Sequence, residues 1–197
     1  MIIVYGDAPL LGSVRTPKKV LVSYLYKRKV SERELYGFDL ALNFHPAPLP
    51  EYRGFAPYTF GILNGETEWG VSCHHMTAEI DAGPLVEVRR FKIEDPENVT
   101  AAGLKDQTMP HLKRLYQDVL ERVARGEELP RLENEGGVYY SKEMFEEARL
   151  TYNETGIPRG DPYDIVDATA RAFWCPPHPG LEWRGFTIAP KCVAGGK

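Results

Sequence analysis

The sequence predicts an α/β domain built on a mostly parallel, Rossmann-like sheet. Three short apolar runs, Ile2–Tyr5, Val20–Tyr24 and Leu40–Phe44, have the β-branched and aromatic composition of buried strands. Connecting segments rather than two-residue turns separate them, which favours crossovers between parallel strands. One long amphipathic helix completes the predicted core, with apolar residues at helical spacing: Leu112, Leu115, Tyr116, Val119, Leu120 and Val123.

The first half of the chain supplies the predicted parallel strands. The strand at residues 2–5 stops at Gly6, and an irregular connection over residues 7–19 leads to the second strand. The segment SERELYG predicts a short helix, with Ser31 as the N-cap, Glu34 at the capping-box position and Gly37 as the stop. The third strand ends at His45-Pro46.

The middle of the chain predicts an antiparallel extension of the sheet. After a proline-rich loop, APYTFGILNG reads as a helix that ends at Asn64-Gly65. The segments WGVSCHHM and PLVEVRRFKI have the character of two strands, and the turn TAEIDAG joins them as a hairpin. The long helix then runs over about residues 111–125, with Pro110 at its start or at a kink and Gly126 as its stop.

The last third of the chain predicts a small C-terminal extension. Residues 127–160 are polar and are expected to be mostly loop. A helix begins with Asp161 as the N-cap and Pro162 at the first helical position, and runs to about Phe173. Phe186–Ile188 adds a short strand. We therefore divide the chain into a core at residues 1–126 and an extension at residues 127–197 that packs on it.

Composition narrows the classes of function. The chain has 197 residues and a net charge of -4, and its strongest basic cluster, Lys27–Lys29, is too short for a nucleic-acid-binding arm. Three cysteines without a CxxC pair fit a reducing compartment and give no structural zinc site. No basic region precedes the apolar N-terminal residues, and no window approaches the ~18 apolar residues of a membrane span. We expect a cytoplasmic protein without nucleic-acid or membrane partners.

The stretch NFHPAPLPEYRG carries the first candidate chemistry. Asn43 and His45 stand at the carboxyl end of a predicted parallel strand, where ligands of open α/β sheets bind. Residues i and i+2 of a strand face the same side, so the two side chains point into one cleft. An amide donor beside a titratable imidazole suits acyl transfer to an amine, in which an oxyanion forms and the amine loses a proton.

A third group is expected to orient or charge the histidine. Asp81 is the best candidate, because it lies in a glycine-containing turn where a carboxylate has no packing purpose. The adjacent His74 and His75 look like a metal pair, but they alternate across a strand and cannot share one face. Amine attack needs no metal, and we expect none.

These motifs together resemble the formyltransferases that use 10-formyltetrahydrofolate. NFHPAPLPEYRG, APYTFGILNGETEWGV and EIDAGPL follow in the family's order, and the similarity covers residues 20 to about 125. The family includes methionyl-tRNA formyltransferase, glycinamide ribonucleotide transformylase and sugar N-formyltransferases. The resemblance implies that Asn43 binds the formyl oxygen as it becomes an oxyanion. It implies that His45 is the acid/base, and that Asp81 holds His45 or a water and helps the proton reach the folate nitrogen.

The resemblance also implies which residues bind the two substrates. Arg28, Lys29 and Val30 would line the folate pocket, and the turn 77–83 would meet the pterin end through Thr77, Ile80 and Asp81. The acceptor would contact Tyr52, Arg53, Gly54 and Pro57 at the end of the proline loop. For Arg53-Gly54, which would contact a phosphate or carboxylate, a plain surface turn is an equally good interpretation.

The chain departs from the family in one place. Family members usually carry two further βα units where this chain has only residues 7–19, so we expect a smaller sheet. The surface for the far end of the acceptor would then be missing or supplied by another subunit, and a homodimer fits this expectation.

The acceptor is expected to be a primary amine on a nucleotide-linked sugar. The region VDATARAFWCPPHPGLEWRGFTI is similar to the segment after the core in sugar N-formyltransferases and in methionyl-tRNA formyltransferase. Two alternatives stay open: formylation of another small amine, such as an amino acid or a ribonucleotide amine, and a non-catalytic folate- or nucleotide-binding module.

Overall fold

The computed structural model describes residues 1–9, 16–154, 162–178, 180–183 and 186–194. The chain forms two compact units that interleave along the sequence. Unit 1 contains Met1–Arg53, Gly70–Phe91 and Thr108–Val138. Unit 2 contains Gly54–Trp69, Lys92–Gln107 and Tyr139–Lys197. The compact units alternate along the sequence. The division into a core at residues 1–126 and an extension at residues 127–197 stays a prediction.

A five-stranded sheet organises unit 1. Its order is β1-β2-β3-β5-β6, with β1 and β2 parallel, β2 and β3 parallel, and β3 and β5 antiparallel. This topology confirms the predicted parallel sheet with an antiparallel extension. The strands are β1 (Ile2–Gly6), β2 (Val20–Tyr24), β3 (Leu40–His45), β5 (Glu68–His75) and β6 (Leu85–Lys92).

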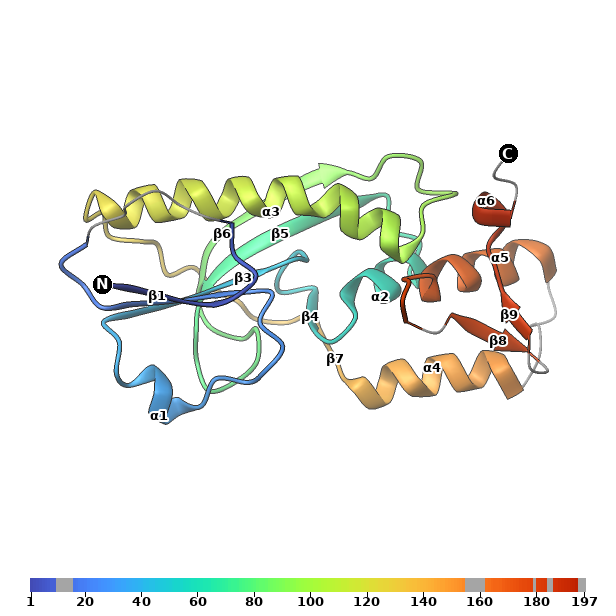
Figure 1. The fold of residues 1–197 in the computed structure, drawn as a ribbon, viewed down its shortest axis with the longest axis horizontal. Coiled ribbons are helices and arrows are strands. Elements are labelled where there is room, and N and C mark those ends of the chain that lie inside the picture. The colour runs from blue at the N-terminus through green and yellow to red at the C-terminus, as the bar shows by residue number, and fades with distance from the viewer. Residues whose placement is uncertain (10–15, 155–161, 179, 184–185, 195–197) are drawn as a thin grey trace. The chain divides into compact units, whose positions relative to one another are not determined.

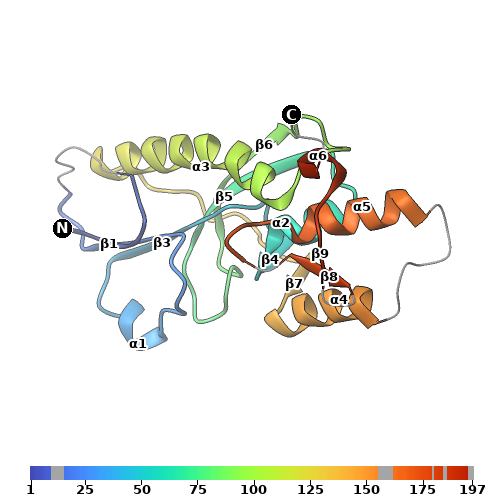
Figure 2. The same ribbon diagram turned by 45° about the vertical axis from the view of Figure 1, so that its right-hand side comes forward.

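One face of this sheet packs against the long helix α3, Ala101–Ala124, as Figures 1 and 2 show. The helical stripe predicted from the sequence is the buried face, and Leu112, Leu115 and Val119 have no exposed surface. Aromatic rings fill the centre of this core. The ring centroids of Tyr116 and Phe44 lie 5.1 Å apart in an edge-to-face arrangement. The strand residues in this core alternate with residues on the other face: Val20, Val22, Tyr24, Leu42 and Phe44.

The short helix α1, Glu32–Leu35, forms as predicted. Ser31 is its N-cap, the Glu34 backbone N–H donates to the Ser31 hydroxyl at 3.3 Å, and the Ser31 backbone N–H donates to the Glu34 carboxylate at 2.8 Å. This reciprocal pair satisfies two backbone donors at the start of a helix too short to be stable alone.

Unit 2 is built mainly from helices. It contains α2 (Pro57–Leu63), α4 (Lys142–Glu154), α5 (Pro162–Phe173) and α6 (Lys191–Ala194), with the antiparallel pair β8 (Leu181–Trp183) and β9 (Phe186–Ile188). The Thr59 hydroxyl donates to the Ala172 carbonyl at 2.9 Å, which ties α2 to α5. The strands β4 (Tyr52–Gly54) and β7 (Val138–Tyr140) form a separate two-stranded sheet. The predicted helix ending at Phe173 and the predicted strand at residues 186–188 are confirmed.

Two expectations about the helices were wrong. Residues 142–154 form α4 where a loop was expected, because Ser141 caps the helix through its hydroxyl and Phe145 packs on Phe55 and Phe173. The helix α3 begins well before Pro110, since Thr100 accepts the Gly103 backbone N–H through its hydroxyl at 3.0 Å. The predicted N-cap Asp161 lies outside the described residues.

Candidate active site

The strand β3 places Asn43 and His45 on the face opposite α3. Leu42 and Phe44 belong to the core beneath the helix, so the alternating residues 43 and 45 project from the other face of the same strand. His45 is 5% exposed, whereas Asn43 is partly exposed. The predicted pair therefore shares one face, next to the point where the strand ends and the proline loop begins.

Asp81 lies between these two side chains. Its Oδ1 accepts a hydrogen bond from Asn43 Nδ2 at 3.1 Å, and its Oδ2 lies 3.4 Å from His45 Nδ1. The carboxylate is buried, with 7% of the residue exposed, and its backbone has a φ of 53° in the left-handed region. The structure thus brings together all three residues that the sequence predicted as catalytic.

His74 is a fourth member of the cluster, and the sequence alone did not predict it there. In the antiparallel pairing of β3 and β5, His74 stands directly opposite Asn43. Its Nε2 lies 3.0 Å from Asn43 Nδ2 and 3.3 Å from Asp81 Oδ1. The expected alternation is confirmed, because the neighbouring His75 instead reaches the Pro130 carbonyl at 2.9 Å.

The contact of His74 Nδ1 shows that this nitrogen carries hydrogen. His74 Nδ1 lies 2.9 Å from the backbone oxygen of His75, which only accepts, so Nδ1 carries the hydrogen. In the neutral ring, Nε2 is then an acceptor for one Asn43 N–H, while the other Asn43 N–H meets Asp81. Both amide hydrogens of Asn43 are engaged in that form of the ring. When Nε2 also carries hydrogen, it donates to Asp81 Oδ1 at 3.3 Å, and one Asn43 N–H is free for another acceptor.

His45 is held between two oxygens. Its Nε2 donates to the backbone carbonyl of Tyr52 at 2.7 Å, and its Nδ1 faces Asp81 Oδ2. Both contacts are satisfied as hydrogen bonds only when both ring nitrogens carry hydrogen. The arrangement can therefore accept a proton on Nδ1 and stabilise the resulting imidazolium with a buried carboxylate, which is the behaviour required of an acid/base group.

Gly83 fixes the path of the turn that carries Asp81. A Cβ at this position would lie 1.8 Å from the backbone oxygen of His75, so only glycine allows this approach. We expect Gly83→Ala to lower the free energy of unfolding by about 1–3 kcal/mol through overpacking and to reduce activity by shifting Asp81. Urea unfolding checks the first effect. Gly37→Ala is the control, since its nearest atom would be 3.6 Å away. Equal stability of the two variants would contradict the account.

Burial lowers the pKa of His75 from its ordinary value of 6.5, and the charges of Arg131 and His74 add to this effect, while the Pro130 carbonyl opposes it. His75 therefore stays neutral in the folded state where the unfolded chain already binds a proton. The unfolded state then holds more protons, so stability is lost as the pH falls below 6.5. We expect His75→Gln to flatten the dependence of the unfolding free energy on pH below 6.5. Urea titrations at several pH values would contradict this if both proteins lost stability in parallel.

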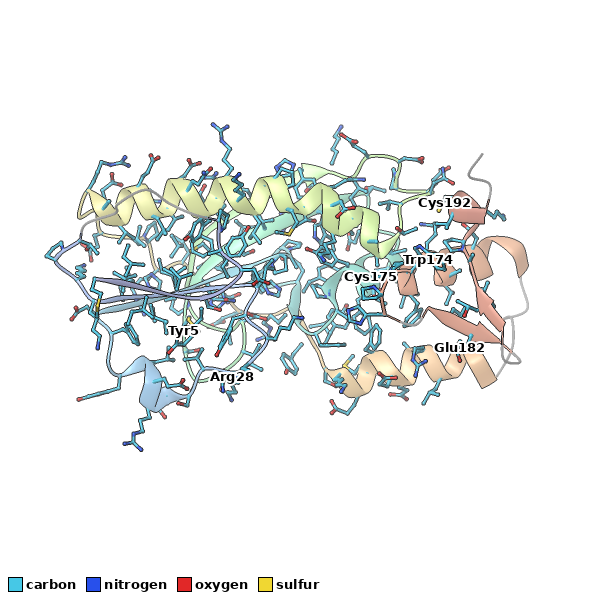
Figure 3. All side chains as sticks on the ribbon, viewed as in Figure 1. Tyr5, Arg28, Trp174, Cys175, Glu182 and Cys192 are labelled. Carbon is cyan, nitrogen blue, oxygen red and sulfur yellow. The ribbon has the colours of Figure 1, made fainter. Side chains whose placement is uncertain are left out.

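The residues predicted to bind the cofactor lie in two segments of unit 1. Arg28 follows β2 and donates from Nε to the Tyr26 hydroxyl at 2.9 Å, and the centroid of the Tyr26 ring lies 5.0 Å from that of Tyr5 in a tilted arrangement. Figure 3 labels Tyr5 and Arg28 on this part of the unit. Lys29 is exposed and Val30 is buried. Folate binding by this segment stays a prediction.

The second predicted folate segment is the turn before Asp81. The Thr77 hydroxyl donates to the Glu79 carbonyl at 3.2 Å, and Ile80 exposes 40% of its surface. An exposed apolar side chain next to a buried carboxylate suits contact with an aromatic ligand ring, and this assignment also stays a prediction.

The residues predicted to bind the acceptor divide between the units. Tyr52 and Arg53 belong to unit 1, whereas Gly54 and Pro57 belong to unit 2. Tyr52 contacts His45 through its backbone carbonyl, and its side chain is buried. Arg53 Nε is buried without a hydrogen-bond partner among the described residues. Gly54 has a φ of 91° and Pro57 begins α2, so both have backbone roles, and acceptor binding stays a prediction.

No group of three or more His, Cys, Asp or Glu side chains in the described part of the chain is arranged to hold a metal ion. None of the helices described is long and apolar enough to cross a membrane.

Comparison with known proteins places this site in a family. A family model described as "Formyl transferase" matches residues 19–120, a segment that contains Asn43, His45, His74 and Asp81. The chain belongs to the formyl transferase family, as the motifs predicted.

Relatives and solved structures differ in the acceptor that their names imply. A methionyl-tRNA formyltransferase of Streptococcus agalactiae is 31% identical over 90% of this chain and 55% of its own length. The chain spans about half the length of the curated relatives it matches. A Mycobacterium tuberculosis protein described as a likely sugar N-formyltransferase shares the fold with a TM-score of 0.72, at 21% identity over 86% of this chain and 72% of its own. An N-formyltransferase of Helicobacter canadensis, in complex with folinic acid and dTDP-3-aminofucose, gives 0.70 at 21% identity, over 85% and 60%.

Proposed function

We propose that the protein transfers a formyl group from 10-formyltetrahydrofolate to a primary amine. The observation that carries the proposal is the buried carboxylate of Asp81 in contact with both Asn43 and His45. This arrangement supplies an amide donor and an acid/base on one face of one strand, and the family membership gives the group that is transferred.

The reaction replaces one C–N bond of the formyl carbon with another. The amine nitrogen attacks the formyl carbon, and the electron pair of the C=O bond moves onto the oxygen. When the pair returns, the bond to N10 of the folate breaks. The amine loses one proton and N10 gains one, so the reaction needs no oxidant or reductant.

Asn43 is the proposed donor to the developing oxyanion. Beside a neutral His74, both of its N–H groups are engaged by Asp81 and His74, so the formyl oxygen replaces one of these partners. Exchange with His74 is the easier of the two, because the contact to the Asp81 carboxylate is charge-assisted. A fixed donor of this kind contributes about 2.7–4 kcal/mol to lowering the barrier.

His45 is the proposed proton carrier. Its Nδ1 faces Asp81, which stabilises the ring while it holds the proton taken from the amine. The Tyr52 carbonyl keeps hydrogen on Nε2, so the exchangeable position is on the side of Asp81. A positioned acid/base of this type contributes about 10²–10⁴ in rate.

For the acceptor we propose an amino sugar carried on a nucleotide. Two observations support this choice: the shared fold with the Helicobacter canadensis enzyme, whose structure holds a dTDP-linked amino sugar, and the buried Nε of Arg53, a guanidinium suited to a phosphate. A different small amine remains the alternative within the same chemistry.

Sequence similarity favours a second acceptor, methionyl-tRNA. A relative that matches over 90% of this chain carries that name. The mild negative charge of the chain argues against this acceptor, since binding to nucleic acid depends on basic surface.

A panel of amines separates these possibilities. The purified protein would be mixed with 10-formyltetrahydrofolate and, in turn, a dTDP-linked amino sugar, methionyl-tRNA, glycine and a ribonucleotide amine, with tetrahydrofolate release followed by absorbance. We expect release with the nucleotide sugar. Release only with methionyl-tRNA or a small amine would overturn the acceptor assignment, and folate binding without turnover would favour a binding module.

A further inference from the structure

One buried polar side chain holds the Asp81 turn from outside the segment that matches the family model. Asn134 lies between α3 and β7, beyond residues 19–120. All of residues 131–139 are described, and Asn134 alone among them is buried, with 8% of its surface exposed. An inward-pointing amide in an otherwise exposed segment indicates a specific partner rather than a solvated loop.

The partners of Asn134 are two backbone carbonyls of the turn. Its Nδ2 donates to the Asp81 carbonyl at 3.0 Å and to the Gly83 carbonyl at 2.7 Å. Both amide hydrogens are used, and a flipped amide would place its oxygen against two other oxygens. The Oδ1 atom is buried without a hydrogen-bond partner among the described residues. Because an unpaired buried acceptor is costly, the two N–H groups are the reason for an asparagine here.

The turn needs this support because its backbone is strained at Asp81. Asp81 has a φ of 53°, a left-handed conformation that non-glycine residues adopt at a cost. Gly83 lies so close to His75 that a Cβ on it would be 1.8 Å from the His75 backbone oxygen. Asn134 donates to the carbonyls of both turn residues, and so fixes the Asp81–Ala82 and Gly83–Pro84 peptide groups.

The segment that carries Asn134 is itself anchored to the sheet. Leu132 and Leu85 exchange two backbone hydrogen bonds, each 2.9 Å long, at the start of β6. His75, at the end of β5, contacts the Pro130 carbonyl. Asn134 therefore reaches the turn from a backbone whose register is set by the two strands that the turn connects.

We propose that Asn134 is a positioning residue for the catalytic carboxylate. It holds the Asp81 backbone so that Oδ1 meets Asn43 and Oδ2 meets His45, and it does not touch the substrates. The role rests on the proposed function, because it concerns the proton carrier of that reaction. A displaced carboxylate would slow the chemical step while leaving the binding of the amine largely intact.

The test uses Asn134→Asp, which keeps the shape of the side chain but lacks the N–H donors, together with Asn134→Ala. We expect the turnover number to fall about ten- to a hundredfold while the KM for the amine identified in the panel changes little. Glu135→Ala is the matched control, since Glu135 is the exposed neighbour, and it should retain wild-type turnover.

A second readout does not depend on turnover. In protein labelled with ¹⁵N-histidine, the ring nitrogens of His45 and His74 should change resonance in both Asn134 variants, because both rings contact Asp81. His111 should not change, since it stacks on Phe91 at the surface. Circular dichroism would confirm folding and give the folded fraction.

Unchanged His45 and His74 resonances in folded Asn134→Asp and Asn134→Ala would overturn the proposal, even if no amine were ever turned over. Turnover per folded molecule equal to that of the wild type would do the same. Shifted histidine resonances in a protein inactive with every amine would instead support the positioning role and refute the proposed function.

Discussion

His45→Ala is expected to lower turnover by at least about a hundredfold while the protein stays folded. The change removes the ring that takes the proton from the amine and leaves the Asp81 carboxylate without that partner. Asn43→Ala is expected to have an effect of similar size, because the oxyanion loses its fixed donor. Single-turnover measurements of tetrahydrofolate release, with circular dichroism of each variant, check both values.

A matched control separates the loss of a catalytic ring from the loss of any histidine. His111→Ala removes an exposed imidazole that stacks 4.0 Å from Phe91 and has no part in the cluster. It should keep turnover within about twofold of the wild type, the spread expected for a surface change. His45→Ala with near wild-type activity would refute the proposed mechanism.

Arg171→Ala is expected to lower the free energy of unfolding by about 3–5 kcal/mol. The guanidinium is buried in α5, where its Nε donates to Asp167 at 3.1 Å and its Nη1 to the Val99 carbonyl at 3.0 Å. Removing it takes the cation away from the Asp167 carboxylate, whose side chain is only 12% exposed, and removes a donor from the Val99 carbonyl. Asp167 also accepts the Lys191 backbone N–H at 2.7 Å, so the start of α6 loses order as well.

The control for this prediction is an ion pair with the same chemistry at the surface of unit 2. Arg149 contacts Glu146 one turn away on α4, but the Glu146 side chain is 42% exposed. Arg149→Ala should therefore change the unfolding free energy by less than about 1 kcal/mol. Denaturant titrations of the two variants check the contrast. A loss of similar size in both would contradict the assignment of Arg171 to a buried network.

The residues that could be predicted from the sequence have neighbours close in sequence or lie at strand ends. Asn43 and His45 were predictable because alternation along one strand decides their face. Asp81 was predictable because it stands in a turn without a packing purpose. The capping box of α1 and the apolar stripe of α3 follow equally local rules, and the structure confirms them.

The residues that were missed depend on tertiary contacts. His74 enters the cluster through the register of β3 against β5, which pairs it with Asn43. The adjacent histidines His74 and His75 do not by themselves indicate that register. Asn134 reaches the turn from a polar segment that reads as a loop. The helix α4 depends on aromatic contacts of Phe145 with residues far along the chain. For His74, a residue-by-residue alignment of the two strands as an antiparallel pair would have placed it opposite Asn43.

The most direct measurement of the central claim follows the formyl carbon itself. The protein would be mixed with 10-formyltetrahydrofolate labelled with ¹³C in the formyl group and with a dTDP-linked amino sugar, and the products analysed by mass spectrometry and ¹³C NMR. The account predicts a formamide on the sugar nitrogen that carries the label, in an amount equal to the tetrahydrofolate released, and almost none with His45→Ala. Labelled formate without any labelled formamide on any amine of the panel would contradict it.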